Sequence, residues 1–224
     1  MIVPKWLSLC LLALACSGIT DSGWATRNIA AWGDSLTDGQ PFTRAESYPT
    51  QLGALLPDRI VTNEGIGGET STQILARMLA DTTHRHDVTV IWMGRNNLTD
   101  PARIQSDVTA AVKSLGSDRY VVLTILNGDF FGTEAKGAPG YETIVDINRS
   151  FAFRYPGNVL DIRSYLVSLY DPANPQDVLD HARDIPPSSL RAHWNGGIDL
   201  LHLSPEANAK VAQRVAEFIT EHGW

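Results

Sequence analysis

Residues 28–38 have the sequence Asn-Ile-Ala-Ala-Trp-Gly-Asp-Ser-Leu-Thr-Asp, and this stretch decides the fold of the chain. Its first five residues are mostly apolar, which is typical of a short buried strand. Glycine, aspartate, serine and threonine follow directly, as where a strand ends and a turn begins. Ser35 is therefore expected at the carboxyl end of a strand, where open α/β sheets place their ligand crevice. Taken alone, the stretch leaves open that Ser35 only caps the next helix.

The same alternation of apolar strands and amphipathic helices continues along the chain. It predicts an α/β fold, a three-layer α/β/α sandwich around a five-stranded parallel sheet. The predicted strands are 28–33, 59–62, 87–93, 119–126 and 158–161, and the predicted helices are 47–56, 71–80, 101–115, 141–155 and 204–222. Residues 163–197 break this rhythm and are rich in Pro, Asp and Ser, which favours a long functional loop or a lid.

The first 27 residues are predicted to lie outside the folded domain. Residues 1–15 carry one positive charge, an apolar run and the ending Ala13-Leu14-Ala15, which together indicate a secretory signal peptide. A membrane anchor is the alternative, but the run is too short to span a bilayer. We expect residues 16–27 to be a linker and 28–224 the domain. The protein is then expected to be exported to the periplasm or beyond the cell.

Both cysteines of the chain lie at this end, at positions 10 and 16. Cleavage after Ala15 would leave Cys16 as the new amino terminus, an arrangement that resembles bacterial lipoproteins, although Ala13 stands where leucine is usual. A lipid on Cys16 would tether the protein to the outer membrane. The domain itself can form no internal disulfide and uses no thiol chemistry.

Composition and motifs exclude several function classes. The chain of 224 residues has a formal net charge of −7 and no basic block, which argues against a nucleic-acid partner. His84 and His86 lie in a polar stretch and form no zinc motif, so no metal is predicted. The glycines at 65–68 lack the ending of a phosphate-binding loop, so no nucleotide cofactor is predicted either.

Four segments are expected to converge at the carboxyl edge of the sheet. They are the serine turn, the glycine turn at 65–68, Gly94-Arg95-Asn96-Asn97 and Asp199-Leu200-Leu201-His202. Acyl transfer uses such a set, because it needs a nucleophile, a base, an orienting carboxylate and donors for the oxyanion. Neutral histidine suits the base near pH 7, and an aspartate can orient its ring. On their own, Asp199 and His202 could instead form an exposed turn before the last helix.

Together these four blocks, in this order, resemble the SGNH/GDSL hydrolase superfamily over about residues 28–220. The resemblance implies the flavodoxin-like SGNH hydrolase fold and a catalytic triad of Ser35, Asp199 and His202. It also implies an oxyanion hole formed by the backbone of Ser35 and Gly68 and by the side chain of Asn96. Asn97 departs from the family pattern, which often has aspartate there, and this puts local hydrogen bonding in question.

The sequence predicts a serine esterase, with a small-molecule or saccharide ester as substrate. Arg95 is expected to contact the substrate or to pack on the rim of the site. His193 and Trp194 are candidates for lining the acyl or alcohol pocket, with a packing role as the alternative. A short acetyl ester of a carbohydrate is favoured, because no long apolar stretch near the site demands a fatty chain and because Arg95 and the polar segment 163–197 suit a polar substrate. Longer acyl chains, as in lysophospholipases or thioesterases, are the alternative. A non-catalytic binding module on the same fold is a third hypothesis, which the intact triad disfavours.

Overall fold

The structure is a computed structural model that describes residues 27–224. The predicted signal peptide, Cys16 and all but the last residue of the predicted linker lie outside the described residues. Within the described part of the chain, no helix is long and apolar enough to cross a membrane.

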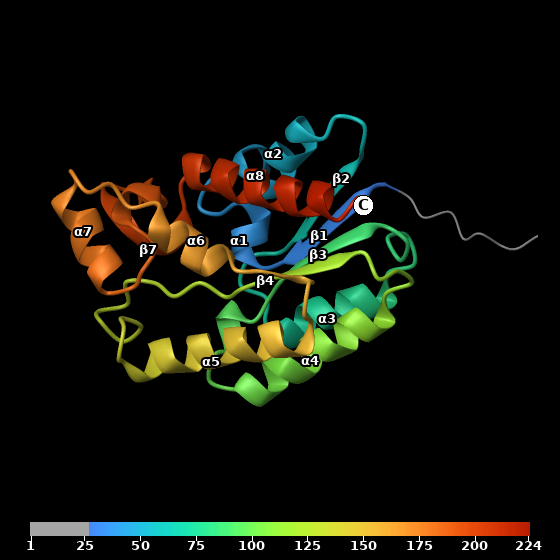
Figure 1. The fold of residues 1–224 in the computed structure, drawn as a ribbon, viewed down its shortest axis with the longest axis horizontal. Coiled ribbons are helices and arrows are strands. Elements are labelled where there is room, and N and C mark those ends of the chain that lie inside the picture. Colours follow the sequence, from blue (N-terminus) through green and yellow to red (C-terminus); the bar gives the residue numbers. More distant parts are fainter. Residues whose placement is uncertain (1–26) are drawn as a thin grey trace, which may run out of the picture.

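A five-stranded parallel sheet forms the centre of the domain, as predicted (Figure 1). The strand order is β2-β1-β3-β4-β5, which is the flavodoxin-like order of a doubly wound sheet. The strands are β1 (Ile29–Gly33), β2 (Val61–Gly65), β3 (Val88–Trp92), β4 (Tyr120–Leu123) and β5 (Val159–Leu160). Because all five strands run in one direction, the turns that follow β1, β2, β3 and β4 meet at one edge.

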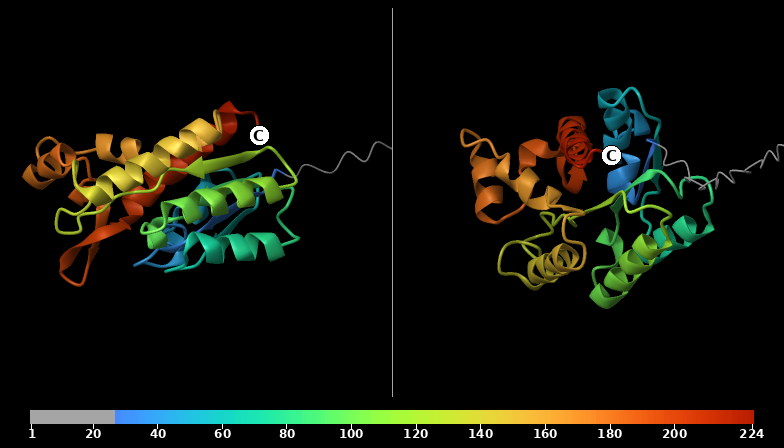
Figure 2. Two further views of the ribbon diagram at one scale, coloured as in Figure 1. Left: turned by 90° about the horizontal axis from the view of Figure 1, so that it is seen from below. Right: turned by 45° about the vertical axis from the view of Figure 1, so that its right-hand side comes forward.

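Helices cover both faces of the sheet and complete the predicted three-layer sandwich (Figures 1 and 2). One face carries α2 (Tyr48–Leu55), α6 (Ile162–Ser168) and α8 (Pro205–Glu221), and the other carries α3 (Ser71–Ala80), α4 (Pro101–Ser114) and α5 (Pro139–Arg154). Shorter elements are α1 (Ser35–Asp38), η1 (Arg44–Glu46), η2 (Arg95–Asn97), α7 (Pro175–Ala182) and η3 (Ser188–Leu190). An antiparallel hairpin of β6 (Arg191–Trp194) and β7 (Gly197–Leu203) lies beyond one end of the sheet.

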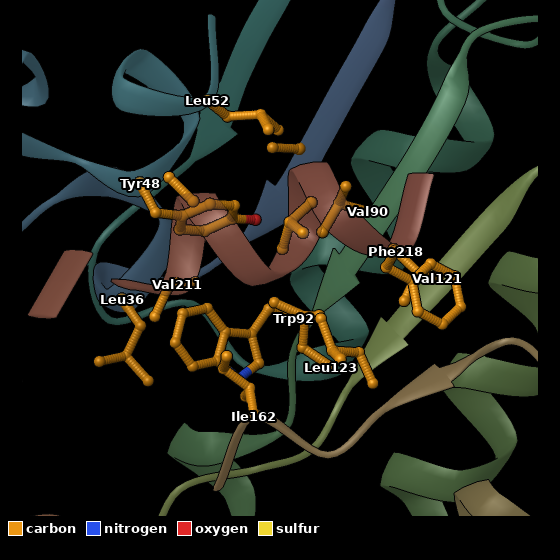
Figure 3. Packing of buried hydrophobic residues seen from close by; sticks show 14 of the residues in the cluster. Leu36, Tyr48, Leu52, Val90, Trp92, Val121, Leu123, Ile162, Val211 and Phe218 are labelled. Atoms are coloured by element: carbon orange, nitrogen blue, oxygen red, sulfur yellow. The ribbon is translucent and has the colours of Figure 1, made fainter. Parts of the chain in front are cut away.

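The core on the α2 and α8 face is built around two aromatic side chains, Tyr48 and Trp92 (Figure 3). Their ring centroids lie 5.6 Å apart in an edge-to-face contact. The indole N–H of Trp92 donates to the backbone oxygen of Thr124 over 3.0 Å, so the ring is buried without an unpaired donor. Trp92 is therefore part of the core.

Two of the predicted strands differ from the observed ones by more than one residue at an end. β2 starts at Val61 and continues through Asn63 and Glu64, because these residues pair with β1 in register from Val61 to Gly65. This edge strand is only half-buried, which explains why its polar residues did not look like a strand. β4 ends at Leu123 rather than at residue 126, and its last residue pairs with Leu160 at the end of β5.

The prediction of a long loop at 163–197 is wrong, because that segment contains most of α6 and all of α7, η3 and β6. Both helices begin at a side-chain cap. Asp161 accepts the N–H of Ser164 at the start of α6, and Asn174 accepts the N–H groups of Gln176 and Asp177 at the start of α7. These helices are only about two turns long, so they show little periodicity in the sequence.

Candidate active site

Ser35 is the first residue of α1, directly after the tight turn that follows β1. Asp34 is the N-cap of α1, and its Oδ1 accepts the N–H of Leu36 over 3.0 Å. The alternative that Ser35 serves as the cap is therefore wrong, and the Ser35 hydroxyl is left for other contacts. Gly33 permits this turn, because a Cβ there would lie 2.1 Å from Oγ1 of Thr37.

Asp199 and His202 lie in strand β7 rather than in a turn, and their segment bulges out of the hairpin. Arg191 pairs with Leu203 and His193 pairs with Ile198. Only Ala192 of β6 therefore faces the four residues 199–202 of β7. Such a bulge redirects side chains that regular pairing would hold in the sheet.

The bulge brings His202 into contact with Ser35, which is 167 positions away in the sequence. Nε2 of His202 lies 2.9 Å from Oγ of Ser35, and Nδ1 lies 3.2 Å from both carboxylate oxygens of Asp199. With Nδ1 protonated, the ring donates to Asp199 and Nε2 accepts from the Ser35 hydroxyl. The three side chains thus form one continuous hydrogen-bonded chain.

The Asp199 carboxylate is held in its ionised form by the backbone around it. Its Oδ1 accepts the N–H groups of Leu201 and His202, each over 2.7 Å. Burial would raise the pKa of Asp199, but these two hydrogen bonds and the neighbouring His202 outweigh it and hold the pKa below its ordinary value. A carboxylate in this state can orient the imidazole and balance its charge.

Donors for an oxyanion are available on the turns around Ser35. The backbone N–H groups of Ser35 and Gly68 have no acceptor within residues 27–224. Gly68 has φ +80°, a conformation that favours glycine. Nδ2 of Asn96 donates to the backbone oxygen of Glu69 over 2.9 Å, which fixes the amide and leaves its second N–H for another acceptor.

These groups line one pocket of about 490 Å³. Its lining is mixed: polar groups come from the turns after β1, β2 and β3, and apolar side chains come from β7 and from the segment after β4. The lining residues are Ser35, Gln40, Gly68, Asn96, Phe130, Ile198, Asp199, Leu200, Leu201 and His202.

Comparison with known proteins identifies the family. The model of the GDSL-like Lipase/Acylhydrolase family matches residues 31–210. The chain belongs to this family. It therefore has the fold and the family signature of an ester-bond hydrolase.

Known proteins similar to this GDSL-family chain include one curated protein and several solved structures. The tail spike protein of Salmonella phage epsilon15 is 32% identical over 154 residues, which cover 63% of this chain but only 14% of that protein. A lipase/acylhydrolase from Enterococcus faecalis has a TM-score of 0.66 at 16% identity, covering 88% of this chain and 97% of that one. The esterase EstA from Pseudoalteromonas sp., in a structure inhibited by monoethylphosphonate, has a TM-score of 0.61 at 16% identity. The match covers 87% of this chain and 97% of that one. At such identities the structures share the fold alone.

Asn97, the departure from the family pattern, ties the turn of Asn96 to the start of α3. Its Oδ1 accepts the N–H of Ser71 over 3.1 Å, and its Nδ2 donates to Oγ of Ser71 over 2.9 Å. Ser71 Oγ in turn donates to the buried carboxylate of Asp107 over 2.7 Å. An amide can both accept and donate here, whereas a carboxylate could only accept and would add a second negative charge. Asn97 therefore fits a site that already contains Asp107.

The three predicted substrate contacts do not join the pocket lining. Arg95 is buried, and its guanidinium forms an ion pair with Glu134 over 2.8 Å, so the expectation that it reads the substrate or the rim does not fit its position. His193 is exposed, with Nε2 3.3 Å from the backbone oxygen of Ser188. Trp194 is 50% exposed and packs edge-to-face on Phe42, which follows the pocket residue Gln40 by two positions.

Five pocket residues were missed as site residues from the sequence: Gln40, Phe130, Ile198, Leu200 and Leu201. Ile198 and Leu200 could have been found, because they flank the predicted Asp199. Phe130 could have been found too, since it follows the fourth strand at the same edge of the sheet as the other turns. Arg95 contributes indirectly, because its guanidinium lies 5.0 Å from the ring centroid of Phe130.

Asp34, next to the nucleophile candidate, is an unusual buried acid. Its Oδ2 is buried and has no hydrogen-bond partner within residues 27–224, and the same holds for the hydroxyls of Thr37 and Tyr48. Burial raises the pKa of Asp34 to about 7, against the opposing effects of the Leu36 N–H and of the Arg95 charge.

No group of three or more His, Cys, Asp or Glu side chains in the described range is arranged to hold a metal ion.

Proposed function

We propose that the protein is a serine esterase that hydrolyses carboxylic esters through a covalent acyl-enzyme. The proposal rests above all on the continuous contact from Asp199 through His202 to Ser35, with 2.9 Å between Nε2 and Oγ. His202 takes the proton of Ser35 as Oγ attacks the carbonyl carbon. It then gives that proton to the departing alkoxide. Water then attacks the acyl carbon while His202 takes its proton. The bond from the acyl carbon to Oγ breaks, His202 returns the proton to Ser35, and the acid is released.

The charge that develops on the carbonyl oxygen is proposed to be stabilised by three N–H donors. These are the backbone amides of Ser35 and Gly68 and the second N–H of the Asn96 side chain. Donors that are fixed before the reaction stabilise the transition state without reorganisation. The hydrogen bond from Asn96 to Glu69 supports this role, because it holds the amide in one orientation.

The proposed substrate class is a short-chain ester, with an acetylated carbohydrate as the favoured example. Gln40, Asn96 and the backbone of Gly68 can meet a polar ligand in the pocket. Trp194 is exposed and packs edge-to-face on the half-buried Phe42. Both are within four positions of a pocket residue in the sequence, and Trp194 offers aromatic surface to a ligand with apolar C–H faces. A pocket that combines apolar walls with a few polar groups is typical of small-molecule sites.

Esters of longer acyl chains are the second candidate, favoured by the apolar part of the lining. Phe130, Ile198 and Leu200 contribute apolar surface to the same pocket as His202. A series of p-nitrophenyl esters from acetate to palmitate separates the two candidates. A maximum of kcat/KM at acetate or butyrate supports the short-chain proposal, and a maximum at octanoate or longer supports the second candidate.

The nucleophile assignment is tested with Ser35→Ala and, as a control, Ser106→Ala, which changes an exposed serine on α4. Ser35→Ala should lower kcat by about 10⁶-fold, the effect of removing a catalytic serine. Ser106→Ala should match the wild type. A fluorophosphonate probe should label the wild type and the control but not Ser35→Ala. Labelling of all three would overturn the assignment.

We also propose that the protein is exported, with cleavage near Ala15. The apolar run at 6–15 and its Ala-x-Ala ending support this. Intact-mass measurement on protein from a bacterial envelope fraction should show loss of residues 1–15, with added lipid mass if Cys16 is modified. A full-length chain recovered from the cytoplasm would contradict export.

A further inference from the structure

The bulge that carries Asp199 and His202 takes backbone groups out of the regular hydrogen bonding between β6 and β7. Backbone N–H and C=O groups that leave a β-ladder need other partners, because buried groups without them are costly. Two N–H groups of the bulge, those of Leu201 and His202, are satisfied by the Asp199 carboxylate itself. The oxygen of Leu200 accepts the N–H of Asp129 over 2.7 Å.

A further contact to the bulge backbone comes from Arg191. Nη1 of Arg191 donates to the backbone oxygen of Asp199 over 3.3 Å. Arg191 pairs with Leu203, at the point where the bulge rejoins the ladder. Its side chain thus spans the gap that the bulge opens between the two strands and replaces a missing ladder hydrogen bond.

Arg191 is itself anchored outside the hairpin. Its Nη2 donates to Oδ2 of Asp180 over 2.7 Å, and the exposed fractions of the two side chains are 3% and 0%. Asp180 is fixed on α7, where it also accepts the N–H of Ser188 and the side-chain amide of Gln176. Nη1 of Arg191 lies 3.7 Å from Oδ2 of Asp129, whose backbone supports Leu200. A buried ion pair with these extra hydrogen bonds holds its geometry tightly.

We propose that Arg191, anchored by Asp180, is a positioning residue that holds Asp199 and His202 against Ser35. This rests on the proposed function, since it presumes that these three side chains carry the reaction. The contact of Arg191 with Asp199 is to the backbone oxygen and not to the carboxylate. Arg191 therefore acts on the position of the bulge and does not contact the substrate. The planar guanidinium reaches Asp180 and Asp199 with two separate nitrogens. A lysine ammonium has one nitrogen and cannot keep both contacts at these distances.

The test uses Arg191→Gln and Arg191→Lys, with Arg183→Gln as the matched control. Arg183 also pairs with Asp129, over 2.8 Å, but within the described residues it makes no hydrogen bond to β7. On p-nitrophenyl acetate, Arg191→Gln should lower kcat about 10- to 100-fold, because misplacing a catalytic group by about 1 Å costs up to roughly 100-fold. KM should stay within about twofold of the wild-type value. Arg191→Lys should fall between it and the wild type, and Arg183→Gln should match the wild type.

A purely structural role is separated by measuring at a temperature well below each variant's unfolding transition. A displaced Asp199 stabilises the protonated His202 ring less, so the acidic limb of the pH profile of kcat/KM should move to lower pH in the Arg191 variants. Unchanged kcat and an unchanged limb in a folded variant would overturn the proposal, even if its Tm is lower. If Arg191→Gln does not fold, Arg191→Lys carries the test. Fluorophosphonate labelling of the wild type at a residue other than Ser35 would instead refute the proposed function.

Discussion

The buried acid beside the nucleophile candidate leads to a specific prediction for Asp34→Asn. Asparagine keeps the oxygen that accepts the N–H of Leu36, so the cap of α1 is preserved. It removes the ionisation of a side chain that is 1% exposed. Three groups interact electrostatically with the Asp34 carboxyl: Arg95, Glu69 and Tyr48. The phenol of Tyr48 lies inside the core (Figure 3). Of these three, only Arg95 favours the ionised form, and its charge is already paired with Glu134.

The magnitude follows from the pKa. In the folded state burial raises the pKa of Asp34 from its ordinary value of 3.8 to about 7. Between these values the folded protein holds a proton that the unfolded chain has released, so the free energy of unfolding falls as pH rises. A difference of about 3 pKa units at 1.36 kcal/mol each gives a loss of about 4 kcal/mol. The loss begins near the unfolded-chain pKa of 3.8 and is complete just above the folded-state pKa of about 7. The Asp34→Asn variant should not show this fall in the free energy of unfolding, because its side chain does not ionise.

The assay is urea unfolding of both proteins at several pH values from about 4 to 8.5. The free energy of unfolding of Asp34→Asn, minus that of the wild type, should rise by up to about 4 kcal/mol across this range and then level off. Asp161→Asn is the control, because Asp161 caps α6 in the same way but is exposed. For Asp161→Asn, the same difference in the free energy of unfolding should show no such rise with pH. Parallel curves for Asp34→Asn and the wild type would refute the reasoning.

Two further predictions concern the neighbours Asn96 and Arg95. Asn96→Ala should lower kcat on p-nitrophenyl acetate by about 100- to 1,000-fold, equivalent to about 3–4 kcal/mol, with little change in KM, because an oxyanion donor acts mainly in the transition state. An unchanged kcat would remove Asn96 from the oxyanion hole. Arg95→Ala leaves Glu134 buried without its ion-pair partner. It should lower the free energy of unfolding by about 3–5 kcal/mol in urea, and the double variant Arg95→Ala/Glu134→Gln should recover part of that loss. A wild-type unfolding midpoint for Arg95→Ala would contradict this mechanism.

The parallel sheet could be predicted because buried strands leave a strong local signal. β1 and β3 are continuous apolar runs, each closed by a glycine at the end of the strand or two residues beyond it. An apolar run of this length followed by glycine is typical of a strand buried on both faces. The site candidates at 33–36 and 94–97 follow from the same signal, since each comes at the end of a buried strand. The turn that holds a functional group is visible in the sequence because its strand is visible.

The role of Arg95 could not be predicted from the sequence. It stands in a polar turn beside Asn96, where a charged residue is usually exposed. Its partner Glu134 is 39 positions away, and no local pattern links the two. Burial of a charge depends on finding an opposite charge across the fold, and a single sequence does not show which pairs meet. The short capped helices of the 163–197 segment were missed for a different reason. Each has only about two turns, which is too short for the helical spacing of apolar residues to be recognised in the sequence.

The spacing of Asp199 and His202 explains why the hairpin needs an arginine. In a regular strand, successive side chains alternate between faces, so residues three apart point to opposite sides. Asp199 and His202 could then not both reach Ser35. The bulge solves this by placing four residues of β7 opposite one residue of β6. The Asp199-x-x-His202 motif can therefore bring both side chains to Ser35 only in a chain that also supplies hydrogen-bond partners for the N–H and C=O groups of the bulge. Asp199 is one such partner from within the motif, and Asp129 and Arg191 are partners from outside it. A search for the motif finds the residues proposed to react, but the residues that hold them in place become visible only in the fold.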